Sequence, residues 1–455
     1  MTNLRKLKYV NKLKVSLVSL GCPKNLVDSE VMLGHLPSDR YEIILDESQA
    51  DIIIVNTCAF INDAKEESVD TILEVSDYKE QGHCQLLVVA GCLPQRYQEV
   101  LKDQLPEVDL FIGTSEGPLI VELIEQQLQS KTPGEVVGSP DYLYDHRTPR
   151  VNSSPTYSSY VKIAEGCSNH CSYCIIPQLR GKLRSRSIAS VVEETQNLAA
   201  QGVTEIILIA QDITDYGADR NDGASLVKLL KELVKVDKVI WIRLLYAYPD
   251  GVSDELIELI ATEEKICKYL DLPLQHIDDH LLTQMNRHLD EAQTRELVQR
   301  LRDKIPDLTL RTSFIVGFPG ETNEQFNKLL KFVEEGHFER VGVFRYSREE
   351  GTAAAKFPEQ VPARTKKSRL NKLMKAQARV SFSKNRSLVG STELVLVEGY
   401  SDETDLLLKG RSARQAPEID GQFLITSGVA DVGEYVQLKI TDSSEYDLIG
   451  EMVED

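Results

Sequence analysis

The amino-acid sequence predicts an α/β protein built from an N-terminal α/β domain, a central open (βα)6 barrel and a small C-terminal antiparallel β-barrel. From Tyr160 to about Tyr346, β-rich runs alternate with helical stretches, which is typical of parallel βα units. Before this region, three strand-like segments each lead to a cysteine, and after it short alternating runs are separated by glycines and acidic turns. A chain of 455 residues is long enough for three such cores.

The N-terminal domain is predicted over residues 1–130, followed by a linker over 131–156 that is rich in Pro, Gly, Ser and Asp. Its strand-like segments are 15–20, 52–55 and 86–90, and the cysteines that follow them are Cys22, Cys58 and Cys92. Because the carboxyl ends of parallel strands share one edge of a sheet, these thiols are expected to converge. The alternative is that they are unrelated buried thiols, since free cysteine is a common core residue. Cys84 and Cys267, the latter in a helical-looking stretch over 256–268, receive no role.

The barrel is predicted over residues 157–362. Its strand candidates are 160–164, 203–210, 239–245, 269–272, 309–316 and 341–346, with amphipathic stretches such as 188–201 and 225–236 between them. Active sites of parallel barrels lie at the carboxyl ends of the strands, where this chain has Gln211, Asp212, Gln275, His276 and the Gly-rich run 317–321. The alternative is that each is an ordinary polar loop.

Directly after the first barrel strand, Cys167, Cys171 and Cys174 form a Cys-x-x-x-Cys-x-x-Cys array. Three thiolates on a four-iron cluster leave one iron open to a small molecule, which indicates an enzyme. Structural zinc completed by His170 is an alternative. A disulfide is less favoured, because eight cysteines are too sparse for a disulfide scaffold and no secretory signal is present.

With an aromatic residue just before its last cysteine, this array resembles the signature of the radical S-adenosylmethionine (SAM) superfamily. The resemblance implies that SAM chelates the open iron and that an electron from the cluster splits SAM to give a 5′-deoxyadenosyl radical. It also implies a SAM pocket that includes Tyr173, Gln211, Arg243, Ile315 and Gly317, with Ile315 and Gly317 near the adenine.

Two three-cysteine sites in one chain resemble the radical SAM methylthiotransferases, and the resemblance covers nearly the whole chain. The words Ser-Leu-Gly-Cys-Pro-Lys-Asn at 19–25, Asn-Thr-Cys at 56–58 and Ala-Gly-Cys at 90–92 look like the branch that modifies the twelfth protein of the small ribosomal subunit. The transfer-RNA branch usually has Gln-Met-Asn at positions 23–25.

This family resemblance implies two 4Fe-4S clusters. Cys167, Cys171 and Cys174 would hold the cluster that cleaves SAM, and Cys22, Cys58 and Cys92 would hold an auxiliary cluster. The implied reaction adds a methylthio group to the β-carbon of an aspartate, consumes two SAM molecules and needs an electron donor of the flavodoxin or ferredoxin type.

No catalytic residue beyond the cluster ligands is predicted, because an aliphatic C–H bond is not acidic enough for a side-chain base at neutral pH. Cofactor chemistry must take that step. His276 and His280 stand four residues apart, as zinc ligands on a helix would, but no glutamate is placed for a metalloprotease, so both are expected on a loop and helix surface.

The net charge of the chain indicates which class of macromolecule it binds. The chain carries 52 basic and 71 acidic residues, and residues 387–455 alone carry 4 basic and 15 acidic ones, a net charge of 4 − 15 = −11. A nucleic-acid enzyme generally offers a basic surface, so this balance disfavours transfer RNA and favours a basic ribosomal protein, free or within the ribosome. The alternative is that acidic loops keep the protein soluble.

The C-terminal domain, residues 387–455, is predicted as a barrel of strands 392–397, 406–409, 423–425 and 435–440, and it resembles the TRAM module. The connector before it, 363–386, holds nine basic and no acidic residues and is predicted as a helix with Leu370, Leu373, Met374 and Ala378 on one side. It either touches ribosomal RNA or lays its positive face against acidic neighbours, and the second is favoured.

The basic start of the chain, with Arg5, Lys6, Lys8, Lys12 and Lys14, lacks the apolar stretch of a signal peptide, and no run reaches the length of a membrane span. A soluble, cytoplasmic protein is therefore expected. Two other functions remain open: a transfer-RNA adenosine methylthiotransferase, and a non-catalytic iron–sulfur carrier or zinc-binding adaptor. The βα-barrel pattern argues against the second, since a carrier does not need it.

Overall fold

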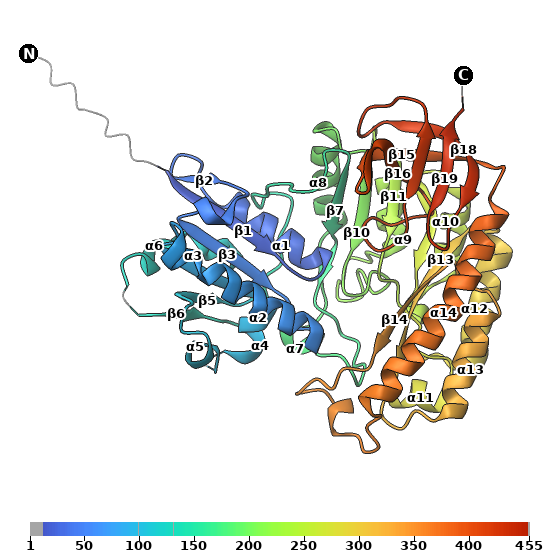
Figure 1. The fold of residues 1–455 in the computed structure, drawn as a ribbon, viewed down its shortest axis with the longest axis horizontal. Helices are drawn as coiled ribbons and strands as arrows, with labels where there is room; N and C mark the ends of the chain where they lie inside the picture. The colour runs from blue at the N-terminus through green and yellow to red at the C-terminus, as the bar shows by residue number, and fades with distance from the viewer. Residues whose placement is uncertain (1–11, 99, 131, 454–455) are drawn as a thin grey trace, which may run out of the picture. The chain divides into compact units, whose positions relative to one another are not determined.

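The computed structural model describes residues 12–98, 100–130 and 132–453, so Arg5, Lys6 and Lys8 of the basic start lie outside the described residues. The chain forms two compact units (Figure 1). Unit 1 comprises Met1–Ser153, Glu165–Ser168 and Cys174–Arg184, and unit 2 comprises Ser154–Ala164, Asn169–Tyr173 and Ser185–Asp455.

Unit 1 contains a six-stranded sheet in the order β2-β1-β3-β4-β5-β6, and every neighbouring pair is parallel. The strands are β1 (Leu13–Ser19), β2 (Tyr41–Ile43), β3 (Ile52–Thr57), β4 (Leu86–Gly91), β5 (Leu110–Ile112) and β6 (Gly134–Val136). The helices are α1 (Pro23–Gly34), α2 (Asn62–Ser76), α3 (Tyr78–Gln81), α4 (Cys92–Tyr97), α5 (Val100–Gln104), α6 (Ile120–Gln127) and α7 (Ile176–Arg180). The three predicted strands are present, and β6 forms within the predicted linker.

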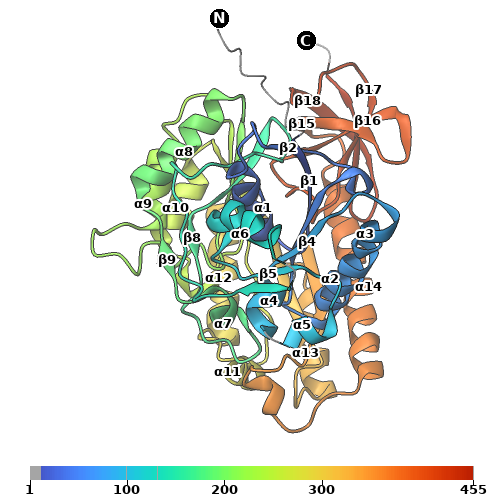
Figure 2. The same cartoon turned by 90° about the vertical axis from the view of Figure 1, so that its left-hand side faces the viewer.

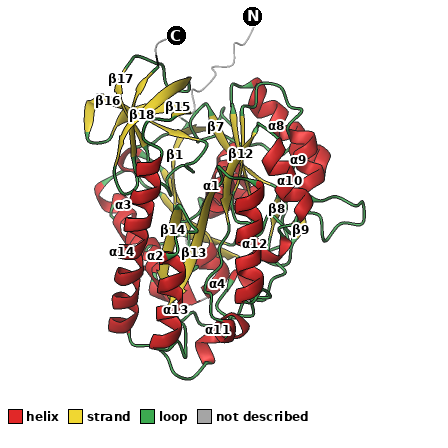
Figure 3. Ribbon diagram, turned by 90° about the vertical axis from the view of Figure 1, so that its right-hand side faces the viewer, coloured by secondary structure: helices red, strands yellow, loops and turns green. Residues whose placement is uncertain are grey.

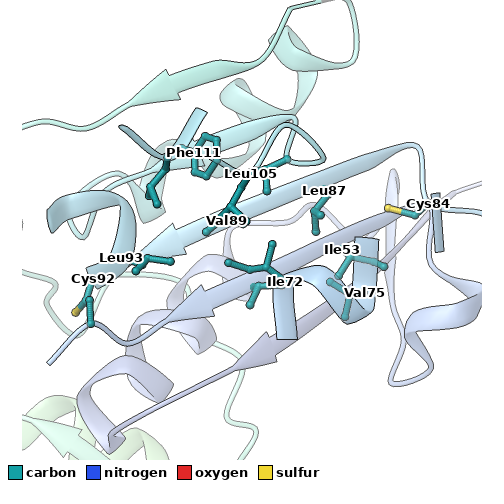
Figure 4. Close-up of a cluster of buried hydrophobic side chains, with 14 of the residues drawn as sticks. Ile53, Ile72, Val75, Cys84, Leu87, Val89, Cys92, Leu93, Leu105 and Phe111 are labelled. Carbon is teal, nitrogen blue, oxygen red and sulfur yellow. The ribbon is translucent and has the colours of Figure 1, made fainter. Parts of the chain in front are cut away.

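The two faces of this sheet bury two separate cores. Ile53 and Val55 of β3 and Leu87 and Val89 of β4 belong to one cluster, and the residues between them belong to the other. Successive side chains of a strand point to opposite faces, so a continuous apolar run is what a parallel strand covered on both sides requires. Figure 4 shows the first cluster, with Cys84 and Cys92 at its opposite ends.

Unit 2 contains a six-stranded open parallel sheet in the order β14-β13-β12-β11-β10-β7, as the βα pattern predicted. Its strands are β7 (Ser158–Lys162), β10 (Glu205–Ile209), β11 (Trp241–Leu244), β12 (Ile266–Asp271), β13 (Thr309–Val316) and β14 (Arg340–Arg345). Its helices are α8 (Ile188–Ala200), α9 (Leu226–Leu233), α10 (Asp254–Thr262), α11 (Asp279–Gln284), α12 (Glu291–Lys304) and α13 (Asn323–Glu334). Figure 2 shows α8, α9 and α10 together. Two short strands, β8 (Ala164–Glu165) and β9 (Arg184–Ser185), lie before and after the spaced cysteines in the sequence.

The assignment of Cys267 to a helical stretch was wrong. Helix α10 ends at Thr262, and Cys267 lies in strand β12. A short buried apolar run looks alike in a helix and in a strand, so its periodicity did not separate the two elements.

The connector is a single helix, α14 (Ala363–Ser387), which packs beside α13 and on β14 (Figure 3). The closed C-terminal barrel runs β15-β16-β17-β19-β18, with strands β15 (Thr392–Ser401), β16 (Thr404–Ser412), β17 (Phe423–Ser427), β18 (Tyr435–Ser443) and β19 (Leu448–Met452). The sequence prediction missed β19, whose five residues do not alternate. The β17–β19 pair is parallel, so the barrel is not antiparallel throughout.

Four short 3-10 turns complete the described elements: η1 (Glu47–Gln49), η2 (Gly117–Leu119), η3 (Pro249–Gly251) and η4 (Ala354–Lys356). Among the helices of the described residues, none has the length and hydropathy needed to cross a bilayer.

Candidate functional site

The three cysteines of unit 1 lie at the carboxyl ends of three adjacent parallel strands, β1, β3 and β4. Cys22 is the N-cap of α1, Cys58 follows β3 directly, and Cys92 begins α4. Between the first two thiols the backbone approaches closely at Gly21, which has φ +89°. A Cβ atom on Gly21 would lie 2.6 Å from Cβ and 3.0 Å from Sγ of Cys58, so only glycine fits beside this thiol.

Buried amides and carbonyls hold this edge of the sheet together. The Asn25 side-chain nitrogen donates to the carbonyl oxygens of Leu20, Asn56 and Thr57 at 2.7, 3.1 and 3.3 Å, and the Asn56 side-chain nitrogen donates to the Asn25 carbonyl at 2.9 Å. Asn25 therefore ties the turn after β1 to the turn after β3. This explains why the words around Cys22 and Cys58 each contain an asparagine.

Burial shapes the chemistry of these thiols. Burial, together with the nearby Cys92 and Cys22, raises the pKa of Cys58 to about 12. Burial also raises the pKa of Cys92, while the charge of Arg180 opposes that rise. Thiols of this kind are neutral by themselves and would release their protons on binding iron.

Arg180, the last residue of α7, brings a buried positive charge to the same thiols. One guanidinium nitrogen lies 3.5 Å from Cys92 Sγ and 3.0 Å from Asn25 Oδ1, and another forms an ion pair with Asp28. The carboxylate of Glu165 lies 3.6 Å away. The sequence analysis missed Arg180, although its place six residues after Cys174 in a short helical segment was a usable signal.

Helix α7 is anchored in the core of unit 1. Ile175 and Leu179 belong to the same buried cluster as Cys92, and the Leu179 carbonyl accepts a hydrogen bond from the Thr114 hydroxyl at 3.0 Å. The chain between Cys174 and Arg180 is therefore held rigidly. Cys174 of the second cysteine array therefore lies one short helix away from Arg180, which contacts the first set.

The residues of this edge fit a 4Fe-4S cluster: three thiols, a glycine cradle and a buried cation that offsets the negative charge of thiolates. Within the described residues, no three His, Cys, Asp or Glu side chains gather as ligands to a single metal ion. A four-iron cluster does not need that arrangement, because each of its thiolates binds a different iron.

The second cysteine array lies on the loop between β8 and α7. In unit 2, the Cys171 sulfur lies 3.8 Å from the Tyr248 hydroxyl and 3.9 Å from the Arg287 guanidinium. The Arg287 guanidinium also stacks over the Tyr248 ring, 3.8 Å from its centre. As at the first set of cysteines, an arginine accompanies a thiol, although Arg287 is only partly buried.

Two of the residues predicted for the SAM pocket lie against the same cluster of unit 2. Tyr173 and Ile315 pack against one cluster of buried side chains that includes Phe318. Gly317 follows β13 with φ +73°, and its amide donates to the Glu321 carboxylate. Gln211 lies two residues after β10, and the next residue, Asp212, accepts a hydrogen bond at 2.8 Å from Asn169 of the cysteine loop.

Two residues lie elsewhere than expected. Arg243 is completely buried, with its Nε 3.0 Å from Glu205 and another nitrogen donating to the Ala413 carbonyl at 2.8 Å. Its guanidinium is therefore engaged by Glu205 and the C-terminal barrel instead of a SAM pocket. His276 was expected at the surface, which was wrong: it is fully buried, 3.3 Å from Glu321. The pairing partners of both residues are distant in sequence.

Two solved structures have a similar fold. A radical SAM methyltransferase from Kitasatospora setae, TsrM with cobalamin and a 4Fe-4S cluster, aligns over 75% of this chain and 74% of its own, with a TM-score of 0.55 and 15% identity. The cobalamin-dependent radical SAM enzyme OxsB aligns over 81% of this chain and 56% of its own, with a TM-score of 0.52 and 12% identity. At such identities the likeness concerns the fold alone.

Sequence comparison is more specific. The chain matches the uncharacterized protein family UPF0004 over residues 14–113, the radical SAM superfamily over 161–333 and the TRAM domain over 389–453. It is 68% identical to "Ribosomal protein uS12 methylthiotransferase RimO" of Syntrophotalea carbinolica over 98% of both chains, and 62% identical to that of Geobacter sulfurreducens over 97% of this chain and 99% of the relative. The corresponding Bdellovibrio bacteriovorus protein is 48% identical over 97% of each chain. With the cysteine sets described above, these matches show that the chain belongs to the RimO family of radical SAM methylthiotransferases.

Proposed function

We propose that this protein transfers a methylthio group to the β-carbon of an aspartate in small-subunit ribosomal protein uS12, consuming two SAM molecules per product. The observation that carries the proposal is the pair of three-cysteine sets, one gathered at a sheet edge beside Arg180 and one in the spaced array, within a chain 68% identical to a named uS12 methylthiotransferase.

When bound, iron–sulfur clusters and SAM supply the radical and sulfur chemistry that an unactivated carbon requires. Cys167, Cys171 and Cys174 would hold the cluster that acts on SAM. Cys22, Cys58 and Cys92 would hold the auxiliary cluster. The chain's other residues would bind and orient SAM and the substrate, and would set the charge around the clusters.

Three further residues would form the SAM pocket with the polar Gln211. Tyr173 and Ile315 offer apolar surface from one packed cluster, and Gly317 has a positive φ, with the Lys366 side chain packed where a Cβ atom would lie. Arg287 and Arg180 would offset the negative charge of the two sets of thiolates, because each lies within 4 Å of a cysteine sulfur.

We further infer that the substrate is recognised as a basic protein, since residues 387–455 carry a net charge of −11 (4 basic, 15 acidic). The reaction would take electrons from a donor of the flavodoxin or ferredoxin type and proceed in the cytoplasm. The acidic C-terminal barrel makes transfer RNA a poor substrate.

The decisive experiment is anaerobic reconstitution, iron and sulfide counting, and incubation with SAM, reductant and uS12, offered both as the free protein and within purified small ribosomal subunits. We expect about eight irons and a uS12 mass gain of roughly 46 Da, a methylthio group replacing hydrogen. Deoxyadenosine formation without any mass gain on uS12, in either form, would contradict the proposal, as would methylthio transfer to transfer RNA instead.

Two substitutions test the roles of the two sets of cysteines independently. Cys171→Ala is expected to abolish deoxyadenosine formation, whereas Cys58→Ala is expected to retain it and stop methylthio transfer. The readouts are deoxyadenosine by chromatography and uS12 mass. Persistence of transfer in Cys58→Ala would show that the auxiliary set is misassigned.

A further inference from the structure

The basic connector helix α14 carries two different sets of cations. Toward its C-terminal end, Arg379 pairs with Glu334 at 3.1 Å, Lys384 with Glu339 at 2.7 Å and Arg386 with Asp442 at 2.5 Å. These cations lie against acidic neighbours, as the sequence analysis favoured.

The N-terminal half of α14 is different. A shallow groove of about 430 Å³ on its outer surface is lined entirely by residues of this helix. We call these residues the basic stripe: Arg364, Lys367, Ser368, Asn371, Lys372 and Lys375. All six are exposed, and within the described residues the structure gives none of the four cations an acidic partner within 4 Å.

The basic stripe is unfavourable for the helix itself. The first turn of α14 contains no acidic residue, and cations near a helix N-terminus oppose the helix dipole. Arg364 and Lys367, and likewise Lys372 and Lys375, are like charges three residues apart on one face, which repel each other. Local helix stability therefore does not account for this charge pattern, whereas an anionic partner would.

We propose that the basic stripe binds the phosphate backbone of small-subunit ribosomal RNA, so that uS12 is modified within the ribosomal particle. This inference rests on the proposed function, because it presumes uS12 as the substrate. A row of cations along a helix, interrupted by a hydroxyl and an amide, suits successive phosphates, which accept hydrogen bonds from Lys, Arg, Ser and Asn side chains.

Charge distribution favours RNA as the occupant. The whole chain has a net charge of −19, so its overall charge repels RNA, whereas the basic stripe offers a local attraction among the residues that the structure describes. A localised cationic row on an acidic protein would therefore orient the enzyme on the particle, and it would do so without reading RNA sequence, because phosphate contacts carry none.

Two triple variants on the same helix test the proposal with an equal loss of charge. The stripe variant is Lys367→Gln, Lys372→Gln and Lys375→Gln, and the control is Arg379→Gln, Lys384→Gln and Arg386→Gln. Binding to purified unmodified small ribosomal subunits is measured between about 50 and 200 mM salt, the range in which phosphate contacts change affinity most visibly. We expect the stripe variant to bind at least about tenfold more weakly, with a slope of log affinity against log salt reduced by about 2. The control should bind within about twofold of wild type, because its three cations already pair with carboxylates of this chain.

Unchanged binding by the stripe variant, or an equal loss in both variants, would overturn the proposal. The proposal would also fail if the stripe variant lost binding to vesicles of anionic phospholipid but kept its binding to subunits. That result would assign the stripe to a membrane surface. SAM cleavage and modification of free uS12, assayed separately, should be the same in wild type and the stripe variant. If wild type modified uS12 in neither form, the proposed function would fail, while the binding comparison would still decide the role of the stripe.

Discussion

Arg180 shows how one side chain can set the charge around a set of buried thiols. It is buried, contacts Cys92 at 3.5 Å and is itself balanced by Asp28 and Glu165. Removing a positive charge beside a cluster disfavours the added electron, so Arg180→Met is expected to lower the reduction potential of the auxiliary cluster. A shift of at least about 59 mV, a tenfold change for one electron, is expected.

The potential is measured by redox titration with electron paramagnetic resonance in a background where Cys167, Cys171 and Cys174 are alanine, so that only the auxiliary cluster reports. Arg180→Lys keeps the charge and should stay close to wild type. Arg150→Met, which removes a buried arginine paired with Glu30 at 2.6 Å, is the control for lost packing. An unchanged potential in Arg180→Met with full iron content would refute this role.

At the scale of elements, the turn between β13 and α13 is held by a helix far along the chain. Glu321 accepts from the Gly317 amide, and Arg369 of α14 donates to it at 2.6 Å, while His276 lies 3.3 Å away. The connector helix thereby fixes the loop that the proposed SAM pocket uses.

Arg369→Met is expected to loosen this loop and weaken SAM binding about tenfold, or about 1.4 kcal/mol. Isothermal titration of SAM into the anaerobically reconstituted protein measures the affinity, with iron content as a check of integrity. Arg379→Met, which removes an exposed cation from the same helix, should leave SAM affinity unchanged. Equal affinities in wild type and Arg369→Met would show that the loop does not depend on α14.

At the scale of the molecule, unit 2 joins its parallel sheet to the C-terminal barrel through a buried ion cluster. Glu205, the first residue of β10, lies 3.0 Å from Arg243 and 2.7 Å from Arg411 of the barrel. Burial alone would raise the pKa of Glu205, but the charges of Arg411 and Arg243 outweigh it and lower the pKa to about 2.

Glu205→Gln leaves two arginines without this carboxylate and is expected to cost about 3–5 kcal/mol of unfolding free energy at pH 7. Because the folded pKa lies below the unfolded value of about 4.3, the stabilisation is fully present above that pH and is lost as pH falls toward 2. The denaturation midpoints of wild type and Glu205→Gln should therefore become more similar as the pH falls. Glu232→Gln, which breaks an exposed pair with Lys235, should cost less than about 1 kcal/mol. If the difference in unfolding free energy between wild type and Glu205→Gln did not change with pH, the stabilisation by Glu205 would not be ionic in origin.

The sequence by itself determined the six strands of the parallel sheet in unit 2 and the length of the connector helix. In unit 1 it determined the strand that precedes each of Cys22, Cys58 and Cys92. These features depend on residues close together in the chain: apolar runs that bury both faces of a parallel strand, and a cysteine placed at the turn that follows. Even the convergence of the three thiols could be predicted, because parallel strands share their carboxyl edge.

Only the tertiary structure decided which charged side chains meet. Arg180 reaches the thiol of Cys92, Arg243 turns to the C-terminal barrel, and His276 is buried by Glu321, in each case through partners between 38 and 170 residues away. The structure also divided α14 into paired and unpaired cations and added β19 to the barrel. Sequence patterns report which face of an element is buried, whereas the partner of a buried charge depends on how distant elements pack, because its desolvation must be offset by whatever group lies beside it in space.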